Sequence, residues 1–422
     1  MMRRRILGIS AMAVAVALTA SACSGGGTVE IDVPAQVEGG FPDELQQQLQ
    51  EAAEHAMAAT GATGAIVGVW APWSGSWVAG LGTTGPDGAA VADDMTFRAS
   101  RVTRAMTCDV LYRLDEKGTV SIDDSVADYV PGVPDLQDVT LGMLCDGTSG
   151  IGSYEPYLKA DWIDFPGREW DPAFLASFGL GDQSDAEPGS AFRDSDAGYV
   201  LLGQALENAT RMSASDLIAE YVTEPLELTS TELPDPAPAE PGANPLPGYQ
   251  SLRGEDGLNC AEPTDFTEAS SSIGFTDSGV TSSIDDLGRY AQALATGALL
   301  AEDSERFDGA LPAYGDAPSW QTTAGGARIT GSLIGQFGTT LGYSTAAFSD
   351  PDTGLTVALV LNNSAGGAAI PGYLAWELAA IASKAPAAAG QEVPDAGLPW
   401  TAEQFHTGIA ERAVCPLPDD EG

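Results

Sequence analysis

Few residues of this 422-residue chain have the type and spacing that acid–base or nucleophilic chemistry requires. The two histidines, His55 and His406, stand near opposite ends of the sequence, which argues against a catalytic or metal centre built from clustered imidazoles. Ser149 and Ser195 have no base at a characteristic spacing, and no G-x-S-x-G motif occurs. The three lysines stand elsewhere in the chain, at Lys117, Lys159 and Lys384. Residue types alone therefore identify no nucleophile and base.

Two further motifs suggest a metal or a cofactor at first sight. Asp194 and Asp196 form the D-x-D pattern that opens a calcium loop, but the following glycine comes one position early and Ala205 replaces the bidentate acid. Gly80–Gly85 matches G-x-G-x-x-G, yet the turn Pro86–Gly88 follows where a dinucleotide site needs the start of a helix. We therefore predict neither a metal site nor a cofactor.

The composition indicates a folded, acidic protein. Hydrophobic residues make up 44% and charged residues 18%, which is enough to bury a large core. Lys and Arg number 18 against 60 Asp and Glu, a net charge of −42. Without Arg3, Arg4 and Arg5 of the leader described next, the balance is 15 against 60, or −45. Such a surface repels phosphate, so we expect no nucleic-acid partner.

The first residues resemble a lipoprotein signal peptide. Arg3–Arg5 precede an apolar run, Ile6–Leu18, and small residues then lead to Cys23. We predict that residues 1–22 are removed and that Cys23 carries the lipid, which places the protein outside the cytoplasm on a membrane. An ordinary signal peptide cut nearby remains the alternative, whereas the apolar run is too short for a transmembrane anchor.

Hydrophobic periodicity predicts helices and strands at both ends of the chain around a mostly helical middle. Residues 23–40 read as a flexible linker. The expected helices are 41–59, 101–117, 198–210, 214–224, 284–299 and 373–384, and the expected strands are 65–70, 76–81, 327–334, 343–349 and 355–361. The pattern predicts an α/β domain over 41–385, with one antiparallel sheet formed by both ends and a helical insert at about 120–270.

Three segments resemble the motifs of one enzyme family. Phe97–Arg104 matches F-R-x-G-S-x-T-K, and the segments that follow it also match. Pro188–Gly203 matches P-G-x-x-F-x-Y-S-N-x-G-Y-x-L-L-G without a gap, and Gly335–Tyr343 matches G-H-x-G-x-T-P-G-Y. Together they resemble the serine β-lactamase family, in its class C β-lactamase and D-alanyl-D-alanine carboxypeptidase branch. The resemblance implies the β-lactamase/transpeptidase-like fold, with the site between sheet and insert.

In this alignment the catalytic columns hold other residues. Arg101 stands in the column of the nucleophilic serine and Arg104 in that of the lysine. Asp194 and Asp196 replace the tyrosine and asparagine of Y-x-N, and Gln336 replaces the basic residue of the third motif. Arginine is no nucleophile and stays protonated, so it cannot act as the base. Losing all these groups argues against the family's reaction.

Two functional hypotheses follow. The first is a catalytically inactive family member, a lipid-anchored envelope protein that binds a peptidoglycan peptide or an envelope protein. The second is an active serine hydrolase with a rearranged site. A purely structural lipoprotein is a third possibility.

Four cysteines remain after the leader, at Cys108, Cys145, Cys260 and Cys415. An even number outside the cytoplasm favours two disulfides, and spacing alone allows three pairings. The resemblance favours Cys108–Cys145, because the second of these falls where the family packs a segment near the helix of the first motif. Cys260–Cys415 would then fasten the C-terminal extension, residues 386–422.

The resemblance also predicts what fills the site. In the family the first-motif lysine lies close to the second motif, so Arg101 and Arg104 should face Asp194 and Asp196 as an ion-pair network. The alternative is that these side chains point into solvent. If Arg101 were unpaired in an open cleft, it would suit a carboxylate such as a peptide C-terminus.

Overall fold

The computed structural model describes residues 28–133, 136–235, 237, 240–255 and 257–417. The leader and Cys23 lie outside these residues. Within them, no helix combines the length and apolar character that crossing a bilayer demands.

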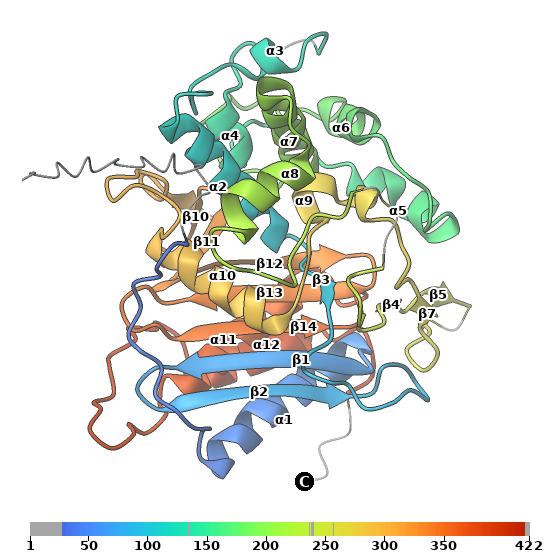
Figure 1. Ribbon diagram of the computed structural model, residues 1–422. Coiled ribbons are helices and arrows are strands. Elements are labelled where there is room, and N and C mark those ends of the chain that lie inside the picture. The colour runs from blue at the N-terminus through green and yellow to red at the C-terminus, as the bar shows by residue number, and fades with distance from the viewer. Residues whose placement is uncertain (1–27, 134–135, 236, 238–239, 256, 418–422) are drawn as a thin grey trace, which may run out of the picture.

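One eight-stranded antiparallel sheet forms the base of the molecule (Figure 1). Its order is β2-β1-β14-β13-β12-β11-β10-β9. In chain order the strands are β1 (Gly64–Ala71), β2 (Gly75–Gly82), β9 (Leu311–Pro312), β10 (Gln321–Ala324), β11 (Ala327–Thr330), β12 (Leu333–Thr340), β13 (Tyr343–Ser349) and β14 (Thr356–Leu361). Because β1 pairs with β14, the sheet joins the two ends of the chain, as the hydrophobic pattern predicts.

The prediction of one strand over 327–334 is wrong, because the structure has two strands there. The chain turns at Gly331, whose φ is 59°, so the segment is divided between β11 and the start of β12. The backbone conformation of this glycine is one that other residues rarely adopt, and it ends the first strand. Apolar and polar residues alternate across Gly331 as they would in one strand, so the pattern did not reveal the turn.

Helices cover both faces of the sheet (Figure 1). On one face α1 (Asp43–Thr60) and α11 (Ala369–Ala382) pack against the strands, and α12 (Ala402–Glu411) packs on both helices. On the other face lies α10 (Ile284–Thr296), whose apolar side contacts β12, β13 and β14. Each face of the sheet thus has its own buried apolar cluster.

The middle of the chain forms the predicted helical layer above the sheet (Figure 1). Its helices are α2 (Val102–Glu116), α3 (Val126–Tyr129), α4 (Leu141–Cys145), α5 (Glu155–Asp164), α6 (Pro172–Leu180), α7 (Asp196–Thr210), α8 (Ala214–Ile218), a π-helical turn η1 (Ala219–Thr223), a 3₁₀ turn η2 (Ser271–Ile273) and α9 (Phe275–Ser278). Short strand pairs complete it: β3 (Phe97–Arg98) with β8 (Thr281–Ser282), β4 (Tyr249–Gln250) with β7 (Thr264–Asp265), and β5 (Arg253–Gly254) with β6 (Gly257–Leu258). Helix α2 is the central element, because most of its residues are buried.

Residues 28–40 do not behave as the flexible linker expected for 23–40. They run extended down one side of the domain (dark blue in Figure 1). The Val29 amide donates to the Pro225 carbonyl, and the Gln36 amide group donates to the Gly75 carbonyl at 2.9 Å. The composition is that of a linker, but backbone and side-chain hydrogen bonds hold this part of it to the surface. The rest of the segment lies outside the described residues.

Both predicted disulfides are present, Cys108–Cys145 and Cys260–Cys415. The first joins α2 to α4, and the second fastens the end of the C-terminal extension to the loop after β6. The extension also packs through α12, where the Trp400 indole donates to the Trp376 carbonyl at 2.9 Å.

Candidate functional site

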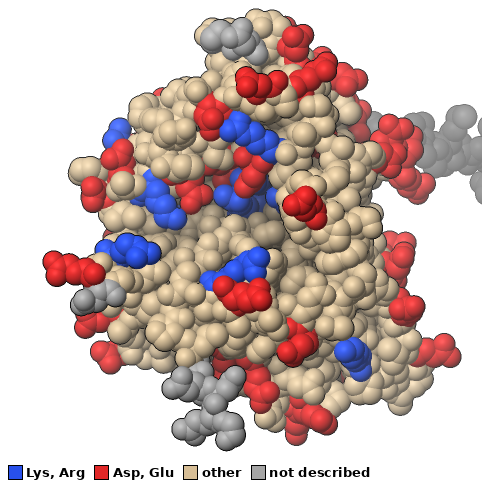
Figure 2. Space-filling view, turned by 180° about the vertical axis from the view of Figure 1, so that it is seen from behind, with Lys and Arg blue, Asp and Glu red and all other residues tan. Residues whose placement is uncertain are grey.

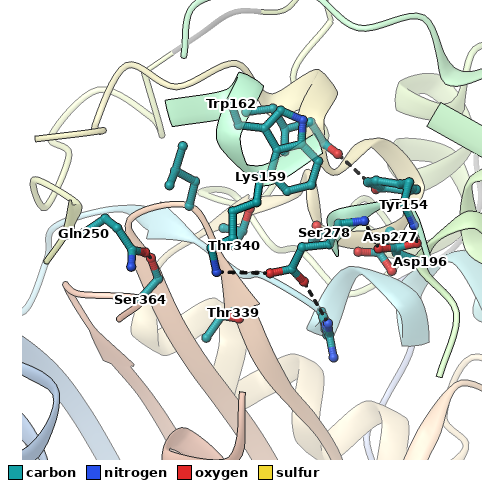
Figure 3. A pocket seen from close by; sticks show the side chains of 14 residues that line it. Tyr154, Lys159, Trp162, Asp196, Gln250, Asp277, Ser278, Thr339, Thr340 and Ser364 are labelled. Atoms are coloured by element: carbon teal, nitrogen blue, oxygen red, sulfur yellow. Dashed lines mark hydrogen bonds and ion pairs between the residues drawn. The ribbon is translucent and has the colours of Figure 1, made fainter. Parts of the chain in front are cut away.

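A narrow cleft lies where the start of α2, the start of α5 and the end of β12 meet (Figure 3). Gln250 and Ser364 lie at one end of it, and Tyr154, Asp196 and Asp277 lie at the other. Arg101, Lys159 and Thr340 also line it, and the space left for water-sized molecules is about 30 Å³. That is room for a few waters, not for a peptide. Figure 2, which views the molecule from behind Figure 1, shows basic and acidic side chains close together in a hollow of the surface.

Arg101 is placed by a tight turn into α2. Ser100 precedes it with φ of 51°, a left-handed conformation that is uncommon for serine. The Ser100 hydroxyl lies 3.3 Å from the Thr345 hydroxyl on β13, and the Thr103 hydroxyl donates to the Ser100 carbonyl at 2.8 Å. The family pattern F-R-x-G-S has glycine where this chain has Ser100. The chain therefore keeps the turn although the residue type no longer favours it.

We predict that glycine at this turn gives a more stable protein than alanine does. Ser100→Ala keeps a Cβ in the left-handed conformation, whereas Ser100→Gly relieves it, so the glycine variant should be more stable by about 1 kcal/mol. Both variants lack the hydroxyl, so its hydrogen bond cancels in the comparison. Urea denaturation measures the difference, and an alanine variant at least as stable as the glycine variant would contradict the prediction.

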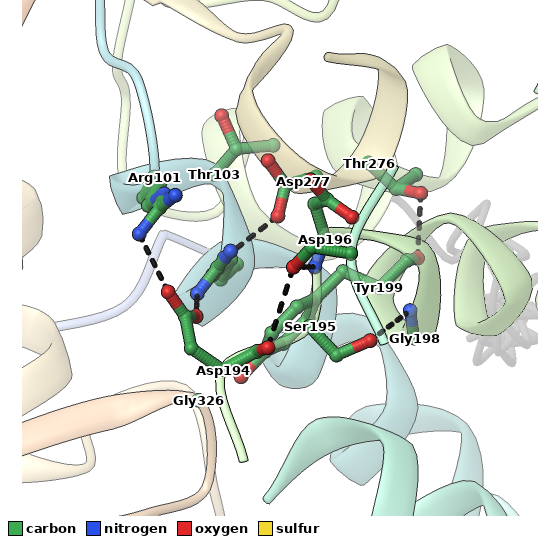
Figure 4. Close-up of polar contacts among 12 residues, drawn as sticks. Arg101, Thr103, Asp194, Ser195, Asp196, Gly198, Tyr199, Thr276, Asp277 and Gly326 are labelled. Carbon is green, nitrogen blue, oxygen red and sulfur yellow. Dashed lines mark hydrogen bonds and ion pairs between the residues drawn. The ribbon is translucent and has the colours of Figure 1, made fainter. Parts of the chain in front are cut away.

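Arg101 and Arg104 share Asp194 (Figure 4). Arg101 Nη1 lies 2.7 Å from Asp194 Oδ2, and Arg104 Nη1 contacts Asp194 Oδ1. Arg101 Nη2 also lies 3.3 Å from Glu155 Oε2, and Arg104 Nε lies 2.7 Å from Asp277 Oδ1. The predicted network thus exists, with two acids that sequence reasoning missed.

Asp196 corrects the prediction that both aspartates face the arginines. Its carboxylate accepts hydrogen bonds from the backbone amides of Tyr154, at 2.7 Å, and Glu155, at 3.0 Å. It therefore caps the start of α5, where free amides favour a negative group. Burial and then the neighbouring Asp277 raise the pKa of Asp196 to about 7. Asp277 lies on the four-residue helix α9, outside the three motifs, so the sequence did not indicate it.

Burial and ion pairing act in opposite directions on the carboxyl group of Asp194. Burial alone would raise the pKa of Asp194, but the guanidinium groups of Arg101 and Arg104 hold it well below its usual range. The Arg104 side chain is 3% exposed and that of Asp277 is 5% exposed, whereas the Asp194 side chain is 38% exposed and partly screened by water. The pair of Arg104 with Asp277 is therefore the buried part of the network.

The side chain of Gln336 makes two hydrogen bonds within the fold. Its side-chain amide donates to the Gly326 carbonyl at 2.8 Å, and its oxygen accepts from the Phe337 amide at 2.9 Å. The side chain is buried and ties β12 to the turn after β10.

The serines considered as substitute nucleophiles also have structural partners. Ser195 Oγ donates to the Gly152 carbonyl at 2.8 Å and caps α7 by accepting from the Gly198 amide. Ser149 Oγ accepts from the Ile151 amide at 3.3 Å. Lys159 does reach the cleft, where its Nζ lies 3.4 Å from Glu155 Oε1.

These features define the class of the protein. An antiparallel sheet joins both ends of the chain, a helical layer stands above it, and the cleft lies at the start of the buried helix α2 between them. This is the β-lactamase/transpeptidase-like fold that the sequence motifs imply. A family model described as Beta-lactamase matches residues 49–380, more than half of the chain, so the chain belongs to the β-lactamase family of serine hydrolases.

Individual relatives are distant. The D-alanyl-D-alanine-carboxypeptidase/endopeptidase AmpH of Escherichia coli is 31% identical over 179 residues, 39% of this chain and 46% of that protein. The match therefore spans about half the length of this relative. Among solved structures, a D-stereospecific amidohydrolase from Streptomyces sp. has a TM-score of 0.66 at 24% identity, covering 76% of this chain and 95% of that one. A penicillin-binding protein homologue from Pyrococcus abyssi has 0.65 at 22% identity, covering 80% and 76%. These structural likenesses concern the fold.

Proposed function

We propose that this chain is a catalytically inactive member of its family that works in the cell envelope by binding. The observation that carries the proposal is the position of Arg101. It occupies the column aligned with the nucleophilic serine, and its guanidinium is engaged by Asp194 and Glu155. A residue that is neither nucleophile nor base, fixed by two acids in a cleft of about 30 Å³, supports a site closed to acyl transfer.

The same geometry supports a proposal about the partner. Because Arg101 already has two carboxylate partners, it is a poor receptor for the C-terminus of a peptide. Of the two partner classes expected from the sequence, this favours an envelope protein bound at the outer surface over a peptidoglycan peptide bound in the cleft.

We further propose lipid attachment at Cys23. The mass of the N-terminal peptide from envelope-purified protein tests it, and an unmodified Cys23 would exclude it.

Covalent labelling tests the loss of catalysis. We expect no adduct when the intact protein is incubated with a fluorescent penicillin or a fluorophosphonate, because no activated serine is present in the motif. A catalytically active D-alanyl-D-alanine carboxypeptidase labelled in parallel is the positive control. An adduct located on any serine of the cleft by mass spectrometry would refute the proposal.

One observation favours the alternative of an active hydrolase with a rearranged site. Ser278 and Ser364 line the cleft together with Lys159. If an adduct forms, Ser278→Ala and Ser364→Ala identify the nucleophile, and Lys159→Met tests whether the lysine acts as its base. Retained labelling in both serine variants would exclude these two residues.

A further inference from the structure

The structure brings together the two histidines that lie 351 positions apart in the sequence. The rings of His55 on α1 and His406 on α12 stack with centroids 3.8 Å apart and planes inclined by 17°. The positions of the two histidines in the sequence did not indicate this contact. In the described residues, no group of histidine, cysteine or acidic side chains has the geometry of a metal site.

A buried carboxyl group completes this cluster. Glu377 of α11 is 3% exposed, and its Oε1 lies 2.8 Å from His406 Nδ1. Its Oε2 is buried and has no hydrogen-bond partner among the described residues. An ionised carboxylate with one partner in an apolar setting is costly, and the neutral acid is far less so.

Aromatic side chains of α11 and α12 pack next to this cluster. Trp376, Tyr373 and Phe405 form an aromatic cluster between α11 and α12. The charged groups near it are few: Glu403 of α12 acts on Glu377, and the Arg412 guanidinium lies over the Tyr373 ring. From α1 the titratable group that faces His406 is His55. The proton between Glu377 and His406 therefore decides much of the charge in this interface.

We propose that Glu377 and His406, with His55 stacked behind them, form a proton-dependent latch that holds α12 against α1 and α11 in acidic surroundings and weakens towards neutral and alkaline pH. While Glu377 is protonated, the neutral acid is hydrogen-bonded to the His406 ring. When Glu377 loses its proton, a buried carboxylate remains whose second oxygen has no hydrogen-bond partner among the described residues.

The direction with pH follows from Glu377. Burial, opposed by the hydrogen bond and charge of His406, raises the pKa of Glu377 to about 7. A carboxyl whose pKa is raised in the closed state stabilises closure fully below its ordinary value of about 4.3. That stabilisation is lost progressively as the pH rises from there through about 7.

The second disulfide joins the segment after α12 to the loop that begins at the cleft. Beyond α12, Cys415 is bonded to Cys260, and the Asn259 amide donates to the Leu252 carbonyl at 3.0 Å. Gln250, at the start of this loop, lines the cleft and accepts a hydrogen bond from Ser364. A loosened α12 thus stays tethered to the domain.

Hydrogen exchange of the full-length protein tests the latch. With intrinsic exchange corrected, the opening constant of amides in α12 should rise by up to about tenfold per pH unit between about pH 5 and 7 and level off above. Glu377→Gln keeps a hydrogen-bonding group but cannot titrate, so its opening constant should not depend on pH. Glu411→Gln is the matched control on the same helix, where the side chain is 69% exposed, and it should behave as the wild type.

Three outcomes would overturn the proposal. The first is a wild-type opening constant that does not change with pH, and the second is a pH dependence retained in Glu377→Gln. If that variant does not fold, infrared difference spectra of the wild type between pH 5.5 and 8.5 provide the check. They should show a buried carboxylic acid losing its proton, and no such band would be the third contradicting outcome.

Discussion

Arg104→Met should destabilise the protein by about 3–5 kcal/mol at neutral pH. Arg104 and Asp277 are both nearly inaccessible to water, and Arg104 Nε lies 2.7 Å from Asp277 Oδ1. Removing the guanidinium leaves the Asp277 carboxylate buried without its cation, beside Asp196. Methionine replaces most of the volume, so the loss reports the uncompensated charge rather than a cavity. Urea denaturation at pH 7.5 gives the free energy of unfolding.

Two controls separate this effect from the simple loss of a cation. Arg113→Met removes an arginine of the same helix whose pair with Glu116 is exposed, and it should cost less than about 1 kcal/mol. Arg104→Met combined with Asp277→Leu removes both charges and should recover more than half of the loss. Equal losses in the single and double variants would contradict the explanation.

The sequence predicted the sheet and the first disulfide from different kinds of information. The sheet follows from alternation and apolar runs, because β1 and β14 are buried on both sides and must pair somewhere. The pairing Cys108–Cys145 came from the family's motifs, since spacing left three possibilities open. Local pattern therefore gave the elements, whereas their connection needed a resemblance.

The site was predictable only where the motifs reach. Arg101, Arg104 and Asp194 stand in aligned columns, so their meeting could be predicted from the sequence. Asp277 could not be, because it is a lone acid on one helical turn and its partner is 173 residues away. Asp196 was misassigned for a physical reason: backbone amides at a helix start compete with guanidinium groups for a carboxylate, and the sequence does not show which is nearer.

The Arg–Asp network links several elements of the helical layer. Arg104 of α2 pairs with Asp194, which lies just before α7, and with Asp277 of α9. The start of α2 thus takes part in holding the helical layer together. Replacing Arg101 or Arg104 alone would therefore leave the acids of the network with fewer cations.

Removing the disulfide Cys260–Cys415 should produce the second large loss of stability. The bond closes a loop with a sequence separation of 155, and the chain-entropy model then gives a stabilisation of about 5 kcal/mol. Cys260→Ser/Cys415→Ser should therefore unfold at much lower urea concentration than the wild type. Cys108→Ser/Cys145→Ser is the matched control. Its loop separation is 37, so the same model gives about 4 kcal/mol.

The position of the loss distinguishes a constraint on the unfolded chain from a local fastening. Cys415 is buried, and its amide donates to the Ala59 carbonyl at the end of α1, so the extension has contacts besides the bond. If the bond acts mainly on the unfolded chain, hydrogen exchange in the central strands β13 and β14 should accelerate as much as in α12, because global unfolding becomes easier throughout. Faster exchange confined to α12, with the urea midpoint unchanged, would show that the disulfide secures only the extension, and the expected global loss would be wrong.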